Sequence, residues 1–198
     1  MTNHLFPTIV VATHNQGKLR EFQSLLLPLN SDILGLADVS IVEEFEETGQ
    51  TFAENARLKA IFYSGLVPFP VLADDSGLEV AALGGRPGVH SARYAGAGTS
   101  DSARVQKLLE ELARNGGARE ARFVCRLALA QEGNLLYESE GQCTGIICTE
   151  PHGSNGFGYD PVFYIPTLGK TLAELSEAEK NRLSHRARAV SALLERMP

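Results

Sequence analysis

The sequence predicts an α/β fold in which helices flank a mixed β-sheet. Residues 8–12 form a continuous apolar, β-branched run, which is typical of a strand covered on both faces. Helical spacing of apolar residues follows it from residue 19. Two strands, at residues 121–130 and at residues 135–140 running on towards 146–147, flank a turn at residues 132–134, which predicts an antiparallel hairpin. The sheet is therefore expected to combine parallel and antiparallel strands.

Composition limits the class of protein. The chain has 198 residues, of which 43% are hydrophobic, enough for one sizeable core, and we expect residues 1–198 to form a single domain. A net charge of −6 argues against a surface that coats nucleic acid. It is compatible with a polyanionic small substrate, because an acidic protein can carry a local basic pocket.

The cysteines and the apolar runs bear on where the protein resides. Cys125, Cys143 and Cys148 are odd in number and lack CxxC spacing, which favours buried thiols in a reducing compartment. The sequence has no signal peptide and no apolar run of about 18 residues. We therefore expect a cytoplasmic protein without a membrane partner.

The first strand leads into a polar loop, residues 13–18, and then into a helix that Pro28 ends. Gly17 and Lys18 before a helix can present N–H groups and a cation to an anion. The loop is not a Walker A motif, because Leu19 stands where Ser or Thr is required. A phosphate site and an ordinary loop both remain open.

A second strand is expected at residues 33–36, with residues 41–42 as a candidate continuation. The acidic run that follows, from Glu43 to Glu47, is either a solvated loop or the source of a metal-binding carboxylate. Thr51 and Glu54 match a capping box that opens a helix reaching to about Gly65. Lys59 on that helix is, taken alone, more typical of a surface lysine than of a ligand.

The apolar run at residues 70–73 predicts a buried strand that stops at Asp74 and Asp75, before a turn at Ser76 and Gly77. Carboxylates at that end of a strand lie where open α/β sheets bind ligands. Two adjacent anions repel unless a cation or a shared proton compensates them, which predicts a metal or acid/base role. An Asp-initiated turn is the alternative.

The remaining helices and one loop complete the pattern. A helix is expected at residues 101–112, capped by Thr99 or Ser100 and ended by Gly116. Phe157 and Tyr159 on a glycine-rich loop predict either stacking on a planar ligand or a packed turn.

Ser184 resembles the N-cap of a last helix whose inward stripe would be Ala187, Val190 and Leu194. Its first turn carries cations, which a helix N-terminus disfavours unless an anion binds there: His185, Arg186 and Arg188.

Taken together, these stretches resemble the inosine triphosphate pyrophosphatase family, which hydrolyses non-standard purine nucleotides. Six motifs over nearly the whole chain carry the resemblance, and His14 replaces a small residue of many members. The motifs lie at residues 12–18, 46–49 with 52–56, 72–78, 87–94, 157–161, and 179–181 with 184–186.

The resemblance implies an elongated α/β fold with a long mixed sheet, two lobes flanking an active-site cleft, and a homodimer. It also implies Mg²⁺-dependent hydrolysis of dITP, ITP and XTP to the monophosphate and pyrophosphate, which cleanses the nucleotide pool. The nearest alternatives are a Maf-like pyrophosphatase of modified pyrimidine nucleotides and a non-catalytic nucleotide-binding regulator.

The resemblance also implies roles for individual residues. Asp75 would be general base and magnesium ligand, and Asp74 and Lys18 would share the catalytic site. Glu46, or else Glu47, would complete the metal site. The triphosphate would be held by the loop Thr13, His14, Asn15, Gln16, Gly17 and Lys18, and Lys59 and Ser76 would also contact the substrate. The base would be held by Phe157, Gly158, Tyr159, Asp160, Lys180, His185 and Arg186.

Two chemical expectations follow from these roles. A carboxyl group with a pKa near 4 is a weak base, so positioning of the attacking water should matter more than basicity. Donors from Lys180, His185 or Arg186 aimed at the 6-oxo group of hypoxanthine would leave adenine unable to pair, at a cost of roughly 1–3 kcal/mol for each unmatched group.

Overall fold

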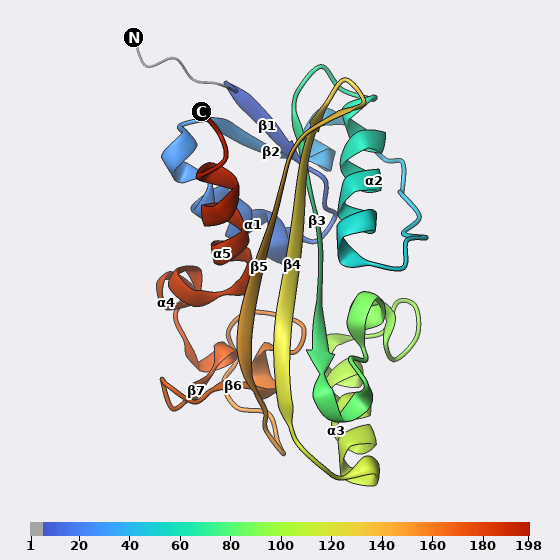
Figure 1. Ribbon diagram of the computed structural model, residues 1–198, viewed down its shortest axis with the longest axis vertical. Coiled ribbons are helices and arrows are strands. Elements are labelled where there is room, and N and C mark those ends of the chain that lie inside the picture. Colours follow the sequence, from blue (N-terminus) through green and yellow to red (C-terminus); the bar gives the residue numbers. More distant parts are fainter. Residues whose placement is uncertain (1–5) are drawn as a thin grey trace. The chain divides into compact units, whose positions relative to one another are not determined.

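A computed structural model describes residues 6–198 (Figure 1). One sheet has the strand order β2-β1-β3-β4-β5-β6-β7. Strand β1 pairs in parallel with β2 and β3, whereas β6 pairs antiparallel with β5 and β7. The predicted mixed α/β sheet is thus confirmed. Its strands are β1 (Thr8–Val11), β2 (Asp32–Gly35), β3 (Val71–Val80), β4 (Glu120–Gln131), β5 (Asn134–Ile147), β6 (Phe163–Ile165) and β7 (Lys170–Thr171).

The helices begin and end close to the sequence signals. Ser100 caps α3 by accepting a hydrogen bond from the Ala103 N–H, and Gly116 ends that helix with φ +63°. The α-helices are α1 (Gln16–Leu25), α2 (Phe52–Ser64), α3 (Asp101–Asn115), α4 (Glu177–Leu183) and α5 (His185–Leu194). Short 3₁₀ helices are η1 (Leu27–Leu29), η2 (Leu36–Val39), η3 (Ala81–Leu83), η4 (Gly88–Arg93), η5 (Asp160–Val162) and η6 (Leu172–Glu174).

The chain divides into two compact units, and β3, β4 and β5 contribute to both. The first unit comprises the chain up to Asp75 together with Cys125–Gly141 and Arg186–Pro198. The second unit comprises Ser76–Val124 and Gln142–His185. The single domain expected from length stays a prediction. No helix in the described part of the chain is long and apolar enough to cross a membrane.

In the first unit the sheet is covered on both faces, because alternate strand residues point to opposite sides. Ile9, Val11 and Leu72 pack in a cluster with residues of α1 and α5. Val10 and Val71 pack in a separate cluster with residues of α2. Figure 1 shows α1 and α5 on one side of these strands and α2 on the other. This double cover explains why the strand at the N-terminus is apolar without alternation.

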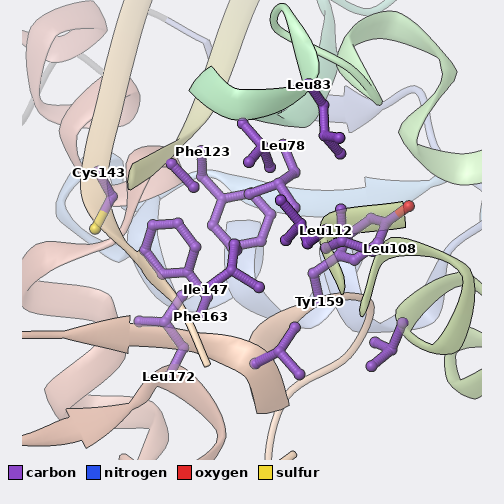
Figure 2. Close-up of a cluster of buried hydrophobic side chains, with 14 of the residues drawn as sticks. Leu78, Leu83, Leu108, Leu112, Phe123, Cys143, Ile147, Tyr159, Phe163 and Leu172 are labelled. Atoms are coloured by element: carbon purple, nitrogen blue, oxygen red, sulfur yellow. The ribbon is translucent and has the colours of Figure 1, made fainter. Parts of the chain in front are cut away.

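The core of the second unit joins α3 to the strands (Figure 2). Phe123 and Phe163 lie at its centre, with ring centroids 4.6 Å apart. Tyr159 belongs to the same cluster, and its hydroxyl donates to the carbonyl of Ser91 at 2.9 Å. One of the two loop aromatics therefore does fill a core, and the packed-turn alternative describes it.

Several element boundaries differ from the sequence expectations. Helix α1 begins at Gln16, so residues 16–18 form its first turn and are not part of a loop. Residues 41–42 do not continue β2, because η2 turns the chain away from the strand. The buried stripe of α5 is Ala189, Val190 and Leu193, so the expected stripe at Ala187 and Leu194 was shifted.

Candidate active site on strand β3

Strand β3 does not stop at Asp74 and Asp75 but runs straight through them and the following Ser76 and Gly77. The expected strand end and the Asp-initiated turn were both wrong. Because neighbouring strand residues point to opposite faces, the two carboxylates separate rather than share one place. Asp74 faces α1 and α5, whereas Asp75 faces α2.

Asp74 is surrounded by cations. Its Oδ2 lies 2.7 Å from the Nζ of Lys18 and 3.9 Å from the Nε of Arg186. Burial would raise the pKa of the Asp74 carboxyl, but the charges of Lys18, Arg186 and Lys59 outweigh it and hold that pKa well below its ordinary value. Asp74 is therefore a permanent anion, unsuited to accept a proton during catalysis.

Asp75 has the opposite electrostatic environment. Its side chain is 5% exposed, and its Oδ2 accepts a hydrogen bond from the Nδ2 of Asn55 at 2.9 Å. Burial first, and the charge of Glu47 second, raise the pKa of Asp75 from 3.8 to about 6. The Asn55 hydrogen bond and the charges of Lys59 and Lys18 oppose this rise. Asp75 is therefore a stronger base than a carboxyl group with the ordinary pKa assumed from the sequence.

Helix α2 binds the acidic segment, residues 43–50, through three side chains spaced four residues apart. Asn55 Oδ1 accepts from the N–H of Gly49 at 2.7 Å, and Lys59 pairs with Glu47. The Tyr63 hydroxyl accepts from the N–H of Phe45 at 3.0 Å and donates to the Glu43 carbonyl. Four helical residues rise about 6 Å, which matches two residues of extended chain. The segment thus runs antiparallel to α2.

This arrangement distinguishes the two candidate glutamates. Glu46 is exposed, whereas Glu47 is half-buried and close enough to Asp75 to raise its pKa. Lys59, with only 12% of its side chain exposed, is not the surface lysine favoured by its local sequence. Burial would lower the pKa of Lys59, but Asp74, Glu47 and Asp75 raise it above its ordinary value.

The residues predicted to hold the triphosphate lie in the loop before α1 and in the first turn of that helix. Asn15 caps the helix, and its Oδ1 accepts from the N–H groups of Gly17 and Lys18 at 2.8 and 3.1 Å. Those two amides are therefore not offered to a phosphate in this structure. Thr13 accepts from the Asn15 N–H, and the neighbouring His14 and Gln16 are exposed.

In the second unit, Asp160 organises the glycine-rich loop. Its Oδ2 accepts from the Nζ of Lys180 at 2.6 Å and from the N–H of Phe157 at 3.0 Å. Lys180 lies 4.8 Å from the centre of the Phe157 ring, a cation–π contact. A Cβ at Gly156 would lie 2.1 Å from Asp160 Oδ2, so only glycine fits there. Gly158, at φ +65°, donates its N–H to Asp101.

Two other predicted site residues, His185 and Arg186, are buried. His185 is 2% exposed and stacks on Phe123, with ring centroids 4.7 Å apart and planes 12° apart. Arg186 is buried in the first unit, where its guanidinium lies 2.9 Å from Glu21. The Arg186 cation therefore faces anions of its own chain, Glu21 and Asp74. Ser76 is half-buried in β3, at the start of the second unit.

A hollow of about 480 Å³ opens elsewhere in the second unit, beside Glu79 and Arg122. These two side chains pair with each other at 2.6 Å. None of the predicted site residues lines this hollow, so it is not part of the candidate active site.

Two residues of this site were missed by sequence reasoning. Asn55 is 1% exposed and Tyr63 is 2% exposed, although both lie on a helix with polar neighbours. A usable signal was present, because Asn55, Lys59 and Tyr63 recur at a spacing of four and share one helix face. Read as a set, they indicate a polar face turned toward another segment.

Comparison with known proteins decides the family. The model of the Ham1 family matches residues 9–196. The chain belongs to the Ham1 family. A relative from Geobacillus kaustophilus, named dITP/XTP pyrophosphatase, is 52% identical over 94% of this chain and 92% of its own. One from Bacillus subtilis with the same name is 48% identical over 93% of each chain.

Solved structures agree with this membership. The Ham1 protein of Coxiella burnetii is 45% identical over 93% of this Ham1 chain and 94% of its own, with a TM-score of 0.84. The Staphylococcus aureus Ham1 protein is 42% identical over 95% and 96%, with a TM-score of 0.83. The α/β fold implied by the family resemblance is thus confirmed.

The separate environments of the two aspartates predict opposite effects on stability. Asp74→Asn should lower the free energy of unfolding at pH 7.5 by about 3–5 kcal/mol, because it removes the buried anion that pairs with Lys18 and lies beside Arg186. Asp75→Asn should raise it by roughly 1–3 kcal/mol, because a carboxyl whose pKa is raised to about 6 costs stability when ionised.

Urea denaturation of both variants measures these effects. The gain in Asp75→Asn should fade at pH 4, below the folded-state pKa, because the wild-type carboxyl is then largely protonated as well. Equal losses in both variants at pH 7.5 would contradict the assignment of opposite charge environments.

Proposed function

We propose that this Ham1 chain hydrolyses dITP, XTP and ITP to the nucleoside monophosphate and pyrophosphate, which removes non-standard purines from the nucleotide pool. The proposal rests on one arrangement: the buried carboxyl of Asp75 accepts a hydrogen bond from Asn55, on the face of β3 where α2 also holds the Glu47–Lys59 pair. The names of the two bacterial relatives support the same reaction.

The donor set of the site fits a magnesium ion. Glu47 and Asp75 are two carboxylates whose mutual repulsion raises the pKa of Asp75, so a divalent cation between them would relieve that repulsion. Magnesium prefers oxygen ligands and is commonly held by one or two carboxylates together with substrate phosphates. Among the described residues no group of three His, Cys, Asp or Glu side chains could hold a metal ion on its own.

Each charged group of the first unit then has a role in the reaction. Magnesium would neutralise charge on the phosphates and on the pyrophosphate leaving group. Asp75 orients the attacking water and accepts its proton. Lys18 and Lys59 bind phosphate oxygens, and Asp74 holds Lys18 in place as a permanent counter-ion.

We assign base recognition to the second unit. Lys180, oriented by Asp160 and lying over Phe157, would donate to the 6-oxo group that hypoxanthine and xanthine share. Tyr159 and Asp160 act by shaping the loop, since both are buried in contacts of their own. His185 contributes a stacked, buried ring. Adenine carries a donor where these bases carry an acceptor, so it could not accept the hydrogen bond that Lys180 would donate to the base.

The proposal includes three further properties: the protein is cytoplasmic, forms a homodimer and requires Mg²⁺ for turnover. Two rival functions make different predictions. A Maf-like enzyme would prefer modified pyrimidine nucleotides to dITP. A non-catalytic regulator would bind dITP without releasing pyrophosphate.

The proposed reaction is tested by measuring pyrophosphate release from dITP, XTP, dATP, dGTP, dUTP and methylated UTP, with Mg²⁺ or with EDTA. We expect release from dITP and XTP with Mg²⁺, and none with EDTA. Asp75→Asn should abolish it while the protein remains folded, since a side-chain amide is too weak a base to accept the proton. Release from methylated UTP alone would support the Maf-like alternative.

Neighbouring glutamates supply a matched control within this assay. Glu47→Gln should raise the Mg²⁺ concentration required for half-maximal rate by at least about tenfold, because it removes a carboxylate beside Asp75. Glu46→Gln, at an exposed position one residue away, should behave like wild type. The reverse result would assign the metal to Glu46.

A second prediction concerns base selectivity. Lys180→Met should lower kcat/KM for dITP by about 5- to 150-fold, because a substrate acceptor loses its donor, and should narrow the preference for dITP over dATP. Arg182→Met, on the exposed side of the same helix, is the control. Unchanged selectivity in a folded Lys180→Met variant would remove Lys180 from base recognition.

A further inference from the structure

Asn55 joins the two parts of the chain that carry the candidate metal-binding carboxylates. It lies in the first turn of α2 and is 1% exposed. Its Nδ2 donates to Asp75 Oδ2 at 2.9 Å, and its Oδ1 accepts from the Gly49 N–H at 2.7 Å. A single buried amide therefore contacts both β3 and the segment that contains Glu47.

The chemistry of these two contacts suits an amide. The backbone N–H of Gly49 can only donate, and an ionised Asp75 can only accept, so the connecting side chain must accept on one side and donate on the other. A carboxylate would present an anion to Asp75, and an aliphatic side chain would leave both groups without a partner. Glutamine has the same groups but is longer by one methylene.

Gly49 makes the close approach possible. A Cβ at this residue would lie 2.5 Å from Asn55 Oδ1, closer than real Cβ atoms approach, and 3.0 Å from Glu54 Cγ, a tight contact. The neighbouring contacts add to the anchor, since Glu54 Oε2 accepts from the Gln50 N–H at 3.0 Å. The backbone two residues after Glu47 is thus held against the first turn of α2.

We propose that Asn55 is a positioning residue that sets the separation between Glu47 and Asp75, and so determines how well this pair binds a divalent cation. The inference rests on the proposed function, because it assigns the metal to these two carboxylates. Asn55 would not touch the substrate or the metal. It fixes one oxygen of Asp75 and the backbone that carries Glu47, and such outer hydrogen bonds typically change metal affinity 10- to 100-fold.

The lysine beside this pair makes fixed spacing necessary. Lys59 already pairs with Glu47 and is attracted by Asp75, so it competes with any divalent cation for the same oxygens. If the acidic segment could move, the position of Glu47 relative to Asp75 would not be fixed. The Asn55–Gly49 contact prevents that movement by anchoring the chain close to Glu47.

Two variants test the proposal by changing one or the other partner of the Asn55–Gly49 hydrogen bond. Asn55→Ala removes the amide, whereas Gly49→Ala leaves it intact and forces the segment away from it. Gly65→Ala is the control at the other end of α2, because a Cβ there would have only an ordinary contact, 3.5 Å from the Phe62 carbonyl. Mn²⁺ binding to the protein without nucleotide is measured by electron paramagnetic resonance, and amide hydrogen exchange is followed over residues 45–50.

We expect Asn55→Ala and Gly49→Ala to bind Mn²⁺ at least about tenfold more weakly than wild type and to exchange residues 45–50 faster. Gly65→Ala should match wild type in both readouts. If Asn55→Ala fails to fold, Gly49→Ala decides the outcome. Wild-type affinity in a folded Gly49→Ala variant, or no Mn²⁺ binding by wild type, would overturn the proposal.

The same proteins separate this inference from the proposed reaction. If wild type binds Mn²⁺ and the two variants bind it weakly, the positioning role holds even where dITP is not hydrolysed. If wild type hydrolyses dITP with Mg²⁺ while Gly49→Ala keeps wild-type Mn²⁺ affinity, the reaction holds and the role of Asn55 fails.

Discussion

Alternation of side chains along β3 is the constraint on which the candidate active site depends. Asp74 and Asp75 are adjacent in sequence, yet the strand directs them to opposite faces of the sheet. Lys18 and Arg186 approach one carboxylate, and Asn55 contacts the other. One dipeptide thereby supplies a permanent anion and a titratable base, because the two faces carry different neighbours.

The helices on the two faces of β3 contribute differently to the site. On one face, α1 and α5 bring cations to Asp74, which fixes Lys18 near the start of α1. On the other face, α2 binds an extended acidic segment through side chains at a spacing of four. Negative charge is thus gathered beside Asp75 by a segment that has no regular secondary structure of its own. Side chains of α2 hold this segment in place.

Much of the fold could be predicted from the sequence, because it follows from local signals. The apolar run of β1, the Ser100 cap of α3 and the turn before Asn134 each specify their element over a few residues. Strand β3 could not be predicted to its end, since Ser76 and Gly77 are typical turn residues and only their neighbours in the sheet keep them extended.

The site was harder to predict, because it depends on contacts between residues distant in sequence. Motif resemblance pointed to Lys18, Asp75 and the two glutamates, but the choice of Glu47 rests on its proximity to Asp75. Asn55 was overlooked because its partners, Gly49 and Asp75, become neighbours only in the folded chain. The raised pKa of Asp75 likewise arises from burial that no local pattern reports.

Titration of the metal-free protein by ¹³C NMR of the aspartate carboxyl carbons tests the central claim directly. Asp75 should titrate at about pH 6, and Asp74 should remain ionised down to the pH at which the protein unfolds. Two carboxyl groups that titrate together near pH 4 would contradict the account, because they would show that β3 does not give its two aspartates separate environments.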